Sequence, residues 1–176
     1  GIRRQAITAL ERTLNHPLGV GRTIAHAAAR FDLAQFLGFT GNYAAARIQY
    51  EQVLPLAREV GDTYRYTAAL QRLGWLAGEQ GDSATAWARL SESLAIFREL
   101  GYAANIADTL NILAEVAILD EDPARAEALL AESRVLEQRE NHDLNIIGWA
   151  LNHLGHAAQL RGAYDRAAQL HHESLE

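Results

Sequence analysis

Small and apolar residues recur along the chain with a period of about 40 residues. An alanine that follows a turn stands at four places with spacings of 40, 40 and 41, namely Ala46, Ala86, Ala126 and Ala167. Thirteen residues before each of them is a leucine followed by a small residue: Leu33-Ala34, Leu73-Gly74, Leu113-Ala114 and Leu154-Gly155. A repeat at this spacing is typical of arrays in which each copy is one small structural unit.

A turn separates the leucine from the alanine in every copy. The turns are Gly41-Asn42-Tyr43, Gly81-Asp82-Ser83, Glu121-Asp122-Pro123 and Gly162-Ala163-Tyr164. Glycine closes one helix and Asn or Asp caps the next, so each repeat is predicted to be a helical hairpin. A weaker break recurs half a period later at Gly61-Asp62, Gly101-Tyr102 and Asn141-His142.

The pattern predicts an all-α protein, an open superhelical solenoid of antiparallel helix hairpins, because one hairpin alone cannot bury its apolar face. The predicted helices are 2–15, 20–39, 43–60, 63–80, 83–100, 103–120, 123–140, 143–161 and 164–175. We expect a single array over 1–176, made of a half-repeat 1–15 and the repeats 20–60, 63–100, 103–140 and 143–176, the last one truncated. Pro55 falls inside a predicted helix, where it should bend the axis or shift the register.

The amino-acid composition is consistent with helices and excludes several kinds of catalytic site. The chain has 33 alanines and 25 leucines against three prolines, which favours helix over strand. It has no cysteine, and all sixteen basic residues are arginine, so thiolate sites and Schiff-base lysines are excluded. We find no phosphate-binding loop, no nucleophile elbow and no catalytic triad supported by its sequence context. We therefore expect no enzyme and no cofactor.

Charge and hydropathy set expectations about partners and location. A net charge of -6 argues against direct binding of nucleic acid or of an anionic membrane. The longest apolar run, Ile112 to Leu119, is interrupted by Glu115 and is too short to span a bilayer. No signal peptide opens the sequence, and we expect a cytoplasmic protein.

The pattern Leu-Gly/Ala, then a small residue, Gly and Ala resembles the tetratricopeptide repeat, with Leu73-Gly74-Trp75-Leu76-Ala77, Gly81-Asp82 and Ala86 as the best copy. The usual repeat has about 34 residues, so this one is a long form. With Glu92-Ser93-Leu94 and the run Arg98 to Gly101, it is similar to the C-terminal repeats of large bacterial regulators, such as signal-transduction ATPases with LuxR-type output domains. The resemblance implies that the superhelical solenoid is right-handed. It also implies a concave, protein-binding face lined by the first helix of each pair.

The resemblance assigns a set of residues to that concave face. The predicted partner-binding residues are Phe31, Gln35, Phe39, Gln71, Trp75, Glu79, Asp108, Asn111, Glu115, Trp149, Asn152, His156 and Gln159. Aromatic anchors and adaptable amides are typical of protein-binding surfaces, although partly buried aromatics also occur as plain packing residues. Since acidic residues occupy groove positions, a C-terminal carboxylate is a poor ligand and a basic, partly apolar segment a good one.

Histidines at 153, 156, 171 and 172 raise the question of a metal site. No cysteine and no His-Glu-x-x-His arrangement accompanies them, so we expect structural or solvated histidines and no metal. Equivalent positions in successive repeats are here called a column. His171 lies in the column of Tyr50, Leu90 and Leu130, which indicates a position in the hairpin core.

We therefore expect a non-catalytic protein-interaction module, the sensing or scaffolding region of a larger bacterial transcriptional regulator. Its partner would be a basic or apolar protein segment, which can belong to the regulator itself. The alternative is a small-ligand sensor coupled to an attached ATPase or cyclase. Because the chain starts without methionine and stops inside a repeat, we also expect self-association through truncated ends at Ala6, Leu10, Leu14, Leu170 and Leu175.

Overall fold

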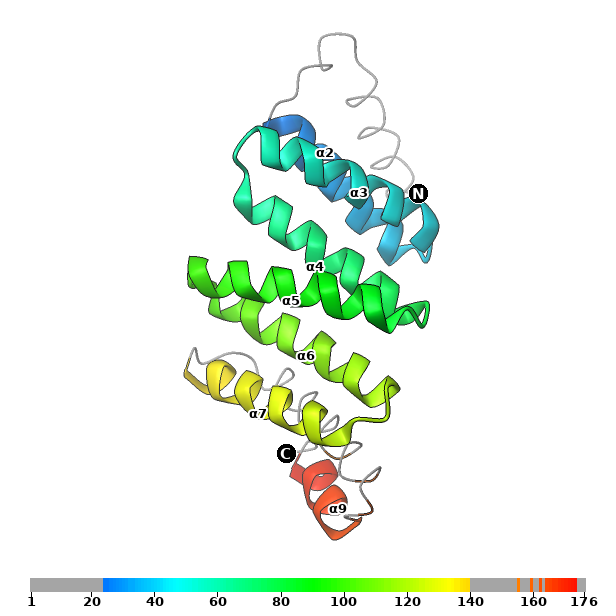
Figure 1. Ribbon diagram of the computed structural model, residues 1–176, viewed down its shortest axis with the longest axis vertical. Coiled ribbons are helices and arrows are strands. Elements are labelled where there is room, and N and C mark those ends of the chain that lie inside the picture. The colour runs from blue at the N-terminus through cyan, green and yellow to red at the C-terminus, as the bar shows by residue number, and fades with distance from the viewer. Residues whose placement is uncertain (1–23, 140–154, 156–158, 160–161, 163, 174–176) are drawn as a thin grey trace. The chain divides into compact units, whose positions relative to one another are not determined.

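The computed structural model describes residues 24–139, 155, 159, 162 and 164–173, and the regular structure of this part of the chain is entirely α-helical (Figure 1). The helices are α2 (Ile24–Phe39), α3 (Tyr43–Glu59), α4 (Thr63–Glu79), α5 (Ser83–Leu100), α6 (Ala103–Leu119), α7 (Pro123–Arg139) and α9 (Tyr164–Glu173). The chain divides into two compact units, Gly1–Leu76 and Ala77–Glu176. No helix of the described part is long and apolar enough to cross a membrane.

The predicted all-α hairpin repeat is confirmed. The helices from α3 to α7 begin where the turn signals place them and end within one residue of the predicted positions. The predicted helices 2–15 and 143–161 fall on residues that the structure does not describe, apart from 155 and 159.

Glycine turns end the helices by one recurring geometry. Gly41, Gly81 and Gly101 have left-handed backbones with φ of 79°, 77° and 72°. The N–H after each glycine donates to the carbonyl five residues back, as from Asp82 to Ala77 at 2.9 Å. This pattern satisfies carbonyls that the helix leaves open, and glycine adopts the left-handed backbone without strain.

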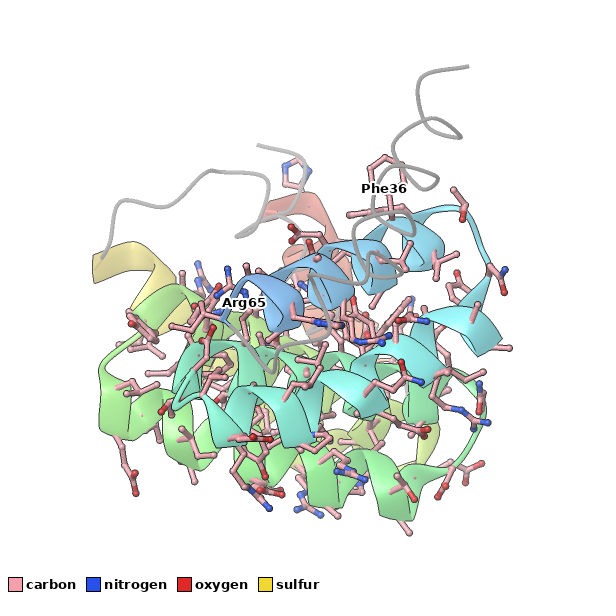
Figure 2. All side chains as sticks on the ribbon, turned by 90° about the horizontal axis from the view of Figure 1, so that it is seen from above. Phe36 and Arg65 are labelled. Atoms are coloured by element: carbon pink, nitrogen blue, oxygen red, sulfur yellow. The ribbon has the colours of Figure 1, made fainter. Side chains whose placement is uncertain are left out.

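Asn and Asp begin the following helices, as their position after glycine predicts. The Asp82 carboxylate accepts from the Thr85 N–H at 3.1 Å, and Asn42 accepts from Ala45 at 3.3 Å. Asp62 accepts from the Arg65 N–H at 3.0 Å and also from its guanidinium at 2.5 Å; Figure 2 labels Arg65 in the first turn of α4. The bonds from the backbone N–H groups of Ala45, Arg65 and Thr85 satisfy donors that the first helical turn leaves without a partner.

Helices α2 and α3 form the described hairpin of the first unit, and they lie side by side in Figure 1. Ala46 and Val53 of α3 are fully buried, and the ring of Tyr50 meets that of Phe31 edge to face at 5.6 Å. Helix α3 runs through Pro55 without a break, and Pro55 is exposed. The small anchor Ala46 lets the two helices approach closely.

Helices of the second unit share a core built from the same columns. A cluster of buried residues joins α6, α7 and α9, and its members are Ala114, Ala117, Ala126, Leu130, Ala167 and Leu170. Leu170, which we expected at an open end, is only 2% exposed, so that part of the self-association argument is wrong. The other end residues, Ala6, Leu10, Leu14 and Leu175, are outside the described part of the chain.

His171 and Gly155 show why a small residue follows the leucine. A Cβ atom added to Gly155 would lie 2.7 Å from Cε1 of His171, closer than real side chains approach. His171 is half-buried and lies against this glycine, which agrees with a packing position in the column of Tyr50, Leu90 and Leu130.

Glu121 departs from the glycine rule and gives a testable prediction. It occupies the place of Gly41 and Gly81 with a left-handed φ of 58°, which strains a residue with a Cβ. We expect Glu121→Gly to raise the free energy of unfolding by about 0.5–1 kcal/mol in urea denaturation, since glycine's looser unfolded state offsets part of the relieved strain.

Two variants separate strain from charge. Glu121→Ala removes the carboxylate but keeps the Cβ, so it should not stabilise. Gly81→Ala should lower stability by about 1 kcal/mol through its backbone alone, because no atom lies within 4 Å of the added Cβ. Equal stabilities for Glu121→Gly and Glu121→Ala would show that backbone strain at this turn is negligible.

Candidate functional site

Three of the predicted binding residues are buried, and this corrects their assignment to an open face. Phe31 is 8% exposed and packs on Tyr50, while Gln71 and Asn111 are 1% and 5% exposed. The column of a residue gives its side of the helix, but neighbouring helices cover much of that side. These side chains therefore offer a partner very little surface in this structure.

The other predicted residues differ in exposure. Phe39, Glu79, Asp108 and Gln159 are exposed, and Gln35, Trp75 and Glu115 are partly buried. Trp149, Asn152 and His156 lie outside the described residues. The binding role of the set stays a prediction.

Three acidic residues of the second unit, Glu79, Asp108 and Glu115, are here called the acidic cluster, and the first two act on Glu115. Burial first, and then the negative charges of Glu79 and Asp108, raise the pKa of Glu115 from 4.5 to about 7. Glu79 is the last residue of α4, whereas the other two lie two turns apart on α6. The fold thus brings together carboxylates that are 36 residues apart in the chain.

Gly78 explains how the end of α4 comes so close to α6. A Cβ at this position would lie 3.2 Å from Cγ2 of Val116, so the backbone of α4 packs directly on the side chain next to Glu115. Glu79 follows Gly78, and Glu115 precedes Val116. This close approach places the two carboxylates where they repel each other.

Trp75 and Tyr43 form an aromatic pair in the first unit. Their ring centroids are 5.6 Å apart and their planes meet at 88°, an edge-to-face contact. Trp75 is half-buried on α4, and Tyr43 is 41% exposed at the start of α3. Phe39, at the end of α2, is 86% exposed. Sequence reasoning missed Tyr43. The available signal was an aromatic residue at a position of the repeat where two other copies have Ser83 and Pro123.

Sequence reasoning also missed a contact around Trp87. The indole N–H of Trp87 on α5 donates to the Asp120 carboxylate at 2.8 Å, and the Arg125 guanidinium lies 3.5 Å from the centre of the ring. The available signal was that Trp87 replaces the Arg47 and Glu127 of its column. Within the described ranges, no three His, Asp or Glu side chains are arranged to hold a metal ion.

Comparison of the sequence with family models gives the repeat its name. Two models, each described as tetratricopeptide repeat, match residues 25–99 and 148–176. The chain carries tetratricopeptide repeats. The matched regions contain the anchors Ala46, Ala86 and Ala167 and the glycine turns before them. No curated protein sequence matches the chain.

Solved structures agree with the tetratricopeptide fold. A crystal structure of BtubC (BKLC) from P. vanneervenii matches with a TM-score of 0.87 and 17% identity, covering 99% of this chain and 72% of that one. A putative kinesin light chain from Podosopora anserina with nearly identical TPR-like repeats matches with a TM-score of 0.76 and 16% identity, covering 98% and 85%. A variant of that protein matches with a TM-score of 0.78, 16% identity and coverage of 98% and 84%.

Tetratricopeptide repeats are protein-interaction modules, and this places the chain in that functional class. Identities of 16–17% support the fold and leave the partner to be argued from the surface of this chain.

Glu115 makes the stability of the tetratricopeptide array depend on pH. Because its pKa is about 7 in the folded chain and 4.5 as the ordinary value, the folded state holds this proton more tightly. Stability is therefore lost as pH rises from about 4.5 through 7. We expect Glu115→Gln to be more stable than wild type at pH 8 by about 1–2 kcal/mol, once solvent screening of the half-buried group is included, and to show no such gain at pH 4.

Urea denaturation of both proteins from pH 4 to 8 measures this difference. Glu99→Gln, which removes an exposed carboxylate from α5, is the matched control and should follow the wild-type curve. A constant difference between Glu115→Gln and wild type across the range would contradict a perturbed Glu115.

Proposed function

We propose that the chain is a non-catalytic protein-binding module that holds a basic side chain of its partner against the acidic cluster. The supporting observation is that burial, and then repulsion by Glu79 and Asp108, raises the pKa of Glu115. A bound cation would relieve this repulsion, so the interaction is stronger than that of one exposed carboxylate.

Charge also limits the kind of partner. A cationic side chain that binds here gains from three carboxylates, whereas an anionic segment is repelled by all of them. Arginine fits well because its planar guanidinium can donate two parallel hydrogen bonds to one carboxylate. A free C-terminal carboxylate on the partner is disfavoured for the same reason.

The first unit supplies a separate apolar contact. Trp75 and Tyr43 are only partly buried, and Phe39 is 86% exposed, which is unusual for a ring that serves packing alone. Aromatic side chains are enriched among the residues that dominate protein interfaces. We assign apolar or arginine side chains of the partner to these rings, on which either can rest.

We extend the proposal to the context of the module: the sensing or scaffolding region of a larger bacterial regulator, with the basic segment on a protein or on the regulator itself. Support comes from the resemblance of Glu92-Ser93-Leu94 and Arg98 to Gly101 to the repeats of such proteins. The sequence that flanks residues 1 and 176 in the gene tests this directly. With a net charge of -6, the chain itself should show no salt-sensitive binding to duplex DNA.

A pair of peptides tests the acidic cluster. We expect a blocked peptide of alternating arginine and leucine to bind the chain, measured by fluorescence anisotropy, and to bind less tightly as salt is added. Glu115→Gln should weaken this binding about fivefold, as expected for a partly exposed ion pair.

Two comparisons make the test specific. A blocked glutamate–leucine peptide should bind far more weakly, and Arg89→Glu on α5 should leave binding of the arginine peptide nearly unchanged. If both peptides bind alike, or if Arg89→Glu abolishes binding while Glu115→Gln has no effect, the assignment to the first-helix residues is wrong.

Binding should also depend on pH. The Glu115 carboxyl has a pKa of about 7, so it is largely protonated at pH 6 and ionised at pH 8. Because only the ionised form attracts a cation, the affinity for the arginine peptide should rise with pH across this range. Glu115→Gln should remove that rise, and an unchanged pH dependence in this variant would exclude Glu115 as its source.

A further inference from the structure

Trp87 lies at a three-way contact on the second unit. It projects from α5, donates its indole N–H to Asp120 just after α6, and carries the guanidinium of Arg125 from α7 on its ring. One side chain thus touches a charged group from each end of the turn that joins α6 to α7. A guanidinium 3.5 Å from the centre of an indole is a close cation–π contact.

Asp120 receives a second donor from the same helix. The hydroxyl of Ser83 and the indole of Trp87 both donate to its carboxylate, and with the charge of Arg125 they lower its pKa. Ser83 and Trp87 are four residues apart, one turn of α5, so both face the same point. Asp120 is therefore held by α5 through two hydrogen bonds although it belongs to the next hairpin.

A second attachment joins the far end of α5 to α7. Arg98 Nη2 lies 2.5 Å from Glu132 Oε1, and both side chains are about half exposed. Along α5, Arg98 is about 16 Å from Trp87 at 1.5 Å per residue. One exposed ion pair contributes little alone, but two separated attachments prevent α5 from pivoting about either.

Packing beside Trp87 depends on small side chains, whereas between Trp87 and Arg98 helix α5 buries the larger Leu90, Leu94 and Phe97. Ala86 of α5 and Ala126 of α7 are fully buried, and Trp87 packs partly against the alanine-rich cluster of α6, α7 and α9. Alanine buries less apolar area than leucine, so it holds helices close but contributes less to their association. At the Trp87 end of α5, directional contacts therefore add to a packing that alanines alone make weaker.

This contact is absent from the shared repeat pattern. Trp87 is replaced by Arg47 one period earlier, and Arg47 pairs within its own helix with Glu51 at 3.9 Å. The columns of the other two members hold Thr40 and Gln80 in place of Asp120, and Ala45 and Thr85 in place of Arg125. Among the described residues, tryptophan, aspartate and arginine occur together in these three columns at one junction.

We propose that Trp87, Asp120 and Arg125, together with Arg98 and Glu132, form a clasp that makes α5 and the α6–α7 hairpin unfold as one cooperative unit. Repeat arrays unfold according to the coupling between neighbouring repeats. A junction with its own directional contacts is more strongly coupled than one that relies on shared packing residues. The clasp therefore determines that α5, α6 and α7 stay folded together when the array begins to unfold.

Hydrogen exchange of the whole chain, followed by mass spectrometry in increasing urea, tests the clasp. In wild type, the slowest amides of α5 should exchange with the same rate and urea dependence as those of α6 and α7, because they open together. In Trp87→Phe combined with Asp120→Ala, those of α5 should exchange about tenfold faster than those of α6 and α7. Trp87→Phe keeps an aromatic ring and removes the donor, and circular dichroism should show an unchanged helix content.

The controls distinguish coupling from general stability. Arg47→Ala, in the same column but paired within one helix, should leave the three helices of the second unit unchanged. If the clasp variant accelerates α5, α6 and α7 equally, the contact stabilises without coupling and the proposal is overturned. It is also overturned if α5 already exchanges independently in wild type, or if the effects of Trp87→Phe and Asp120→Ala on unfolding are additive.

Discussion

Close approach of helices through small side chains is the constraint on which this structure depends. Ala46, Ala86 and Ala126 are fully buried, and at Gly155 a single added carbon would collide with His171. A larger residue in these columns would push the helices apart and expose the leucines beside them. The period of the sequence therefore marks the positions at which neighbouring helices must approach closely. Residues in the remaining columns can vary.

The same constraint produces the acidic cluster. Gly78 brings the end of α4 onto Val116, and the residues next to this contact, Glu79 and Glu115, are drawn together by the packing of their neighbours. Desolvation and repulsion then raise the pKa of Glu115. A surface property of this array thus follows from a packing requirement one residue away.

Much of the fold could be predicted from the sequence because its signals are local. Gly81 ends a helix and Asp82 begins the next by contacts within six residues, so the bounds of α5 follow from the chain itself. Glu121 shows that the turn survives even without glycine, since the spacing of the neighbouring columns determines where it must occur.

The candidate site was less predictable because it depends on depth and on partners distant in sequence. A column places Phe31, Gln71 and Asn111 on the first-helix side, but burial depends on how neighbouring helices cover them. Tyr43 and Trp87 were missed because their contacts, with Trp75 and with Asp120, span 32 and 33 residues between types that no repeat rule pairs. The local signal for Trp87 was a residue that departs from its column, whereas the column of Tyr43 holds tyrosine in two copies and Ser83 and Pro123 in the others.

Residues that differ from the rest of their column show which side chains the fold requires and which it only tolerates. The column of Glu115 contains Gln35 and Trp75, so the hairpin tolerates uncharged side chains there and does not need a carboxylate for packing. Yet Glu115 is half-buried beside two other acids, an arrangement that weakens folding at neutral pH. Trp87, by contrast, departs from its column and gains contacts within the chain from Asp120 and Arg125. A carboxylate that weakens folding where packing does not require it supports a role in binding, because a cationic partner would relieve the repulsion among the three acids.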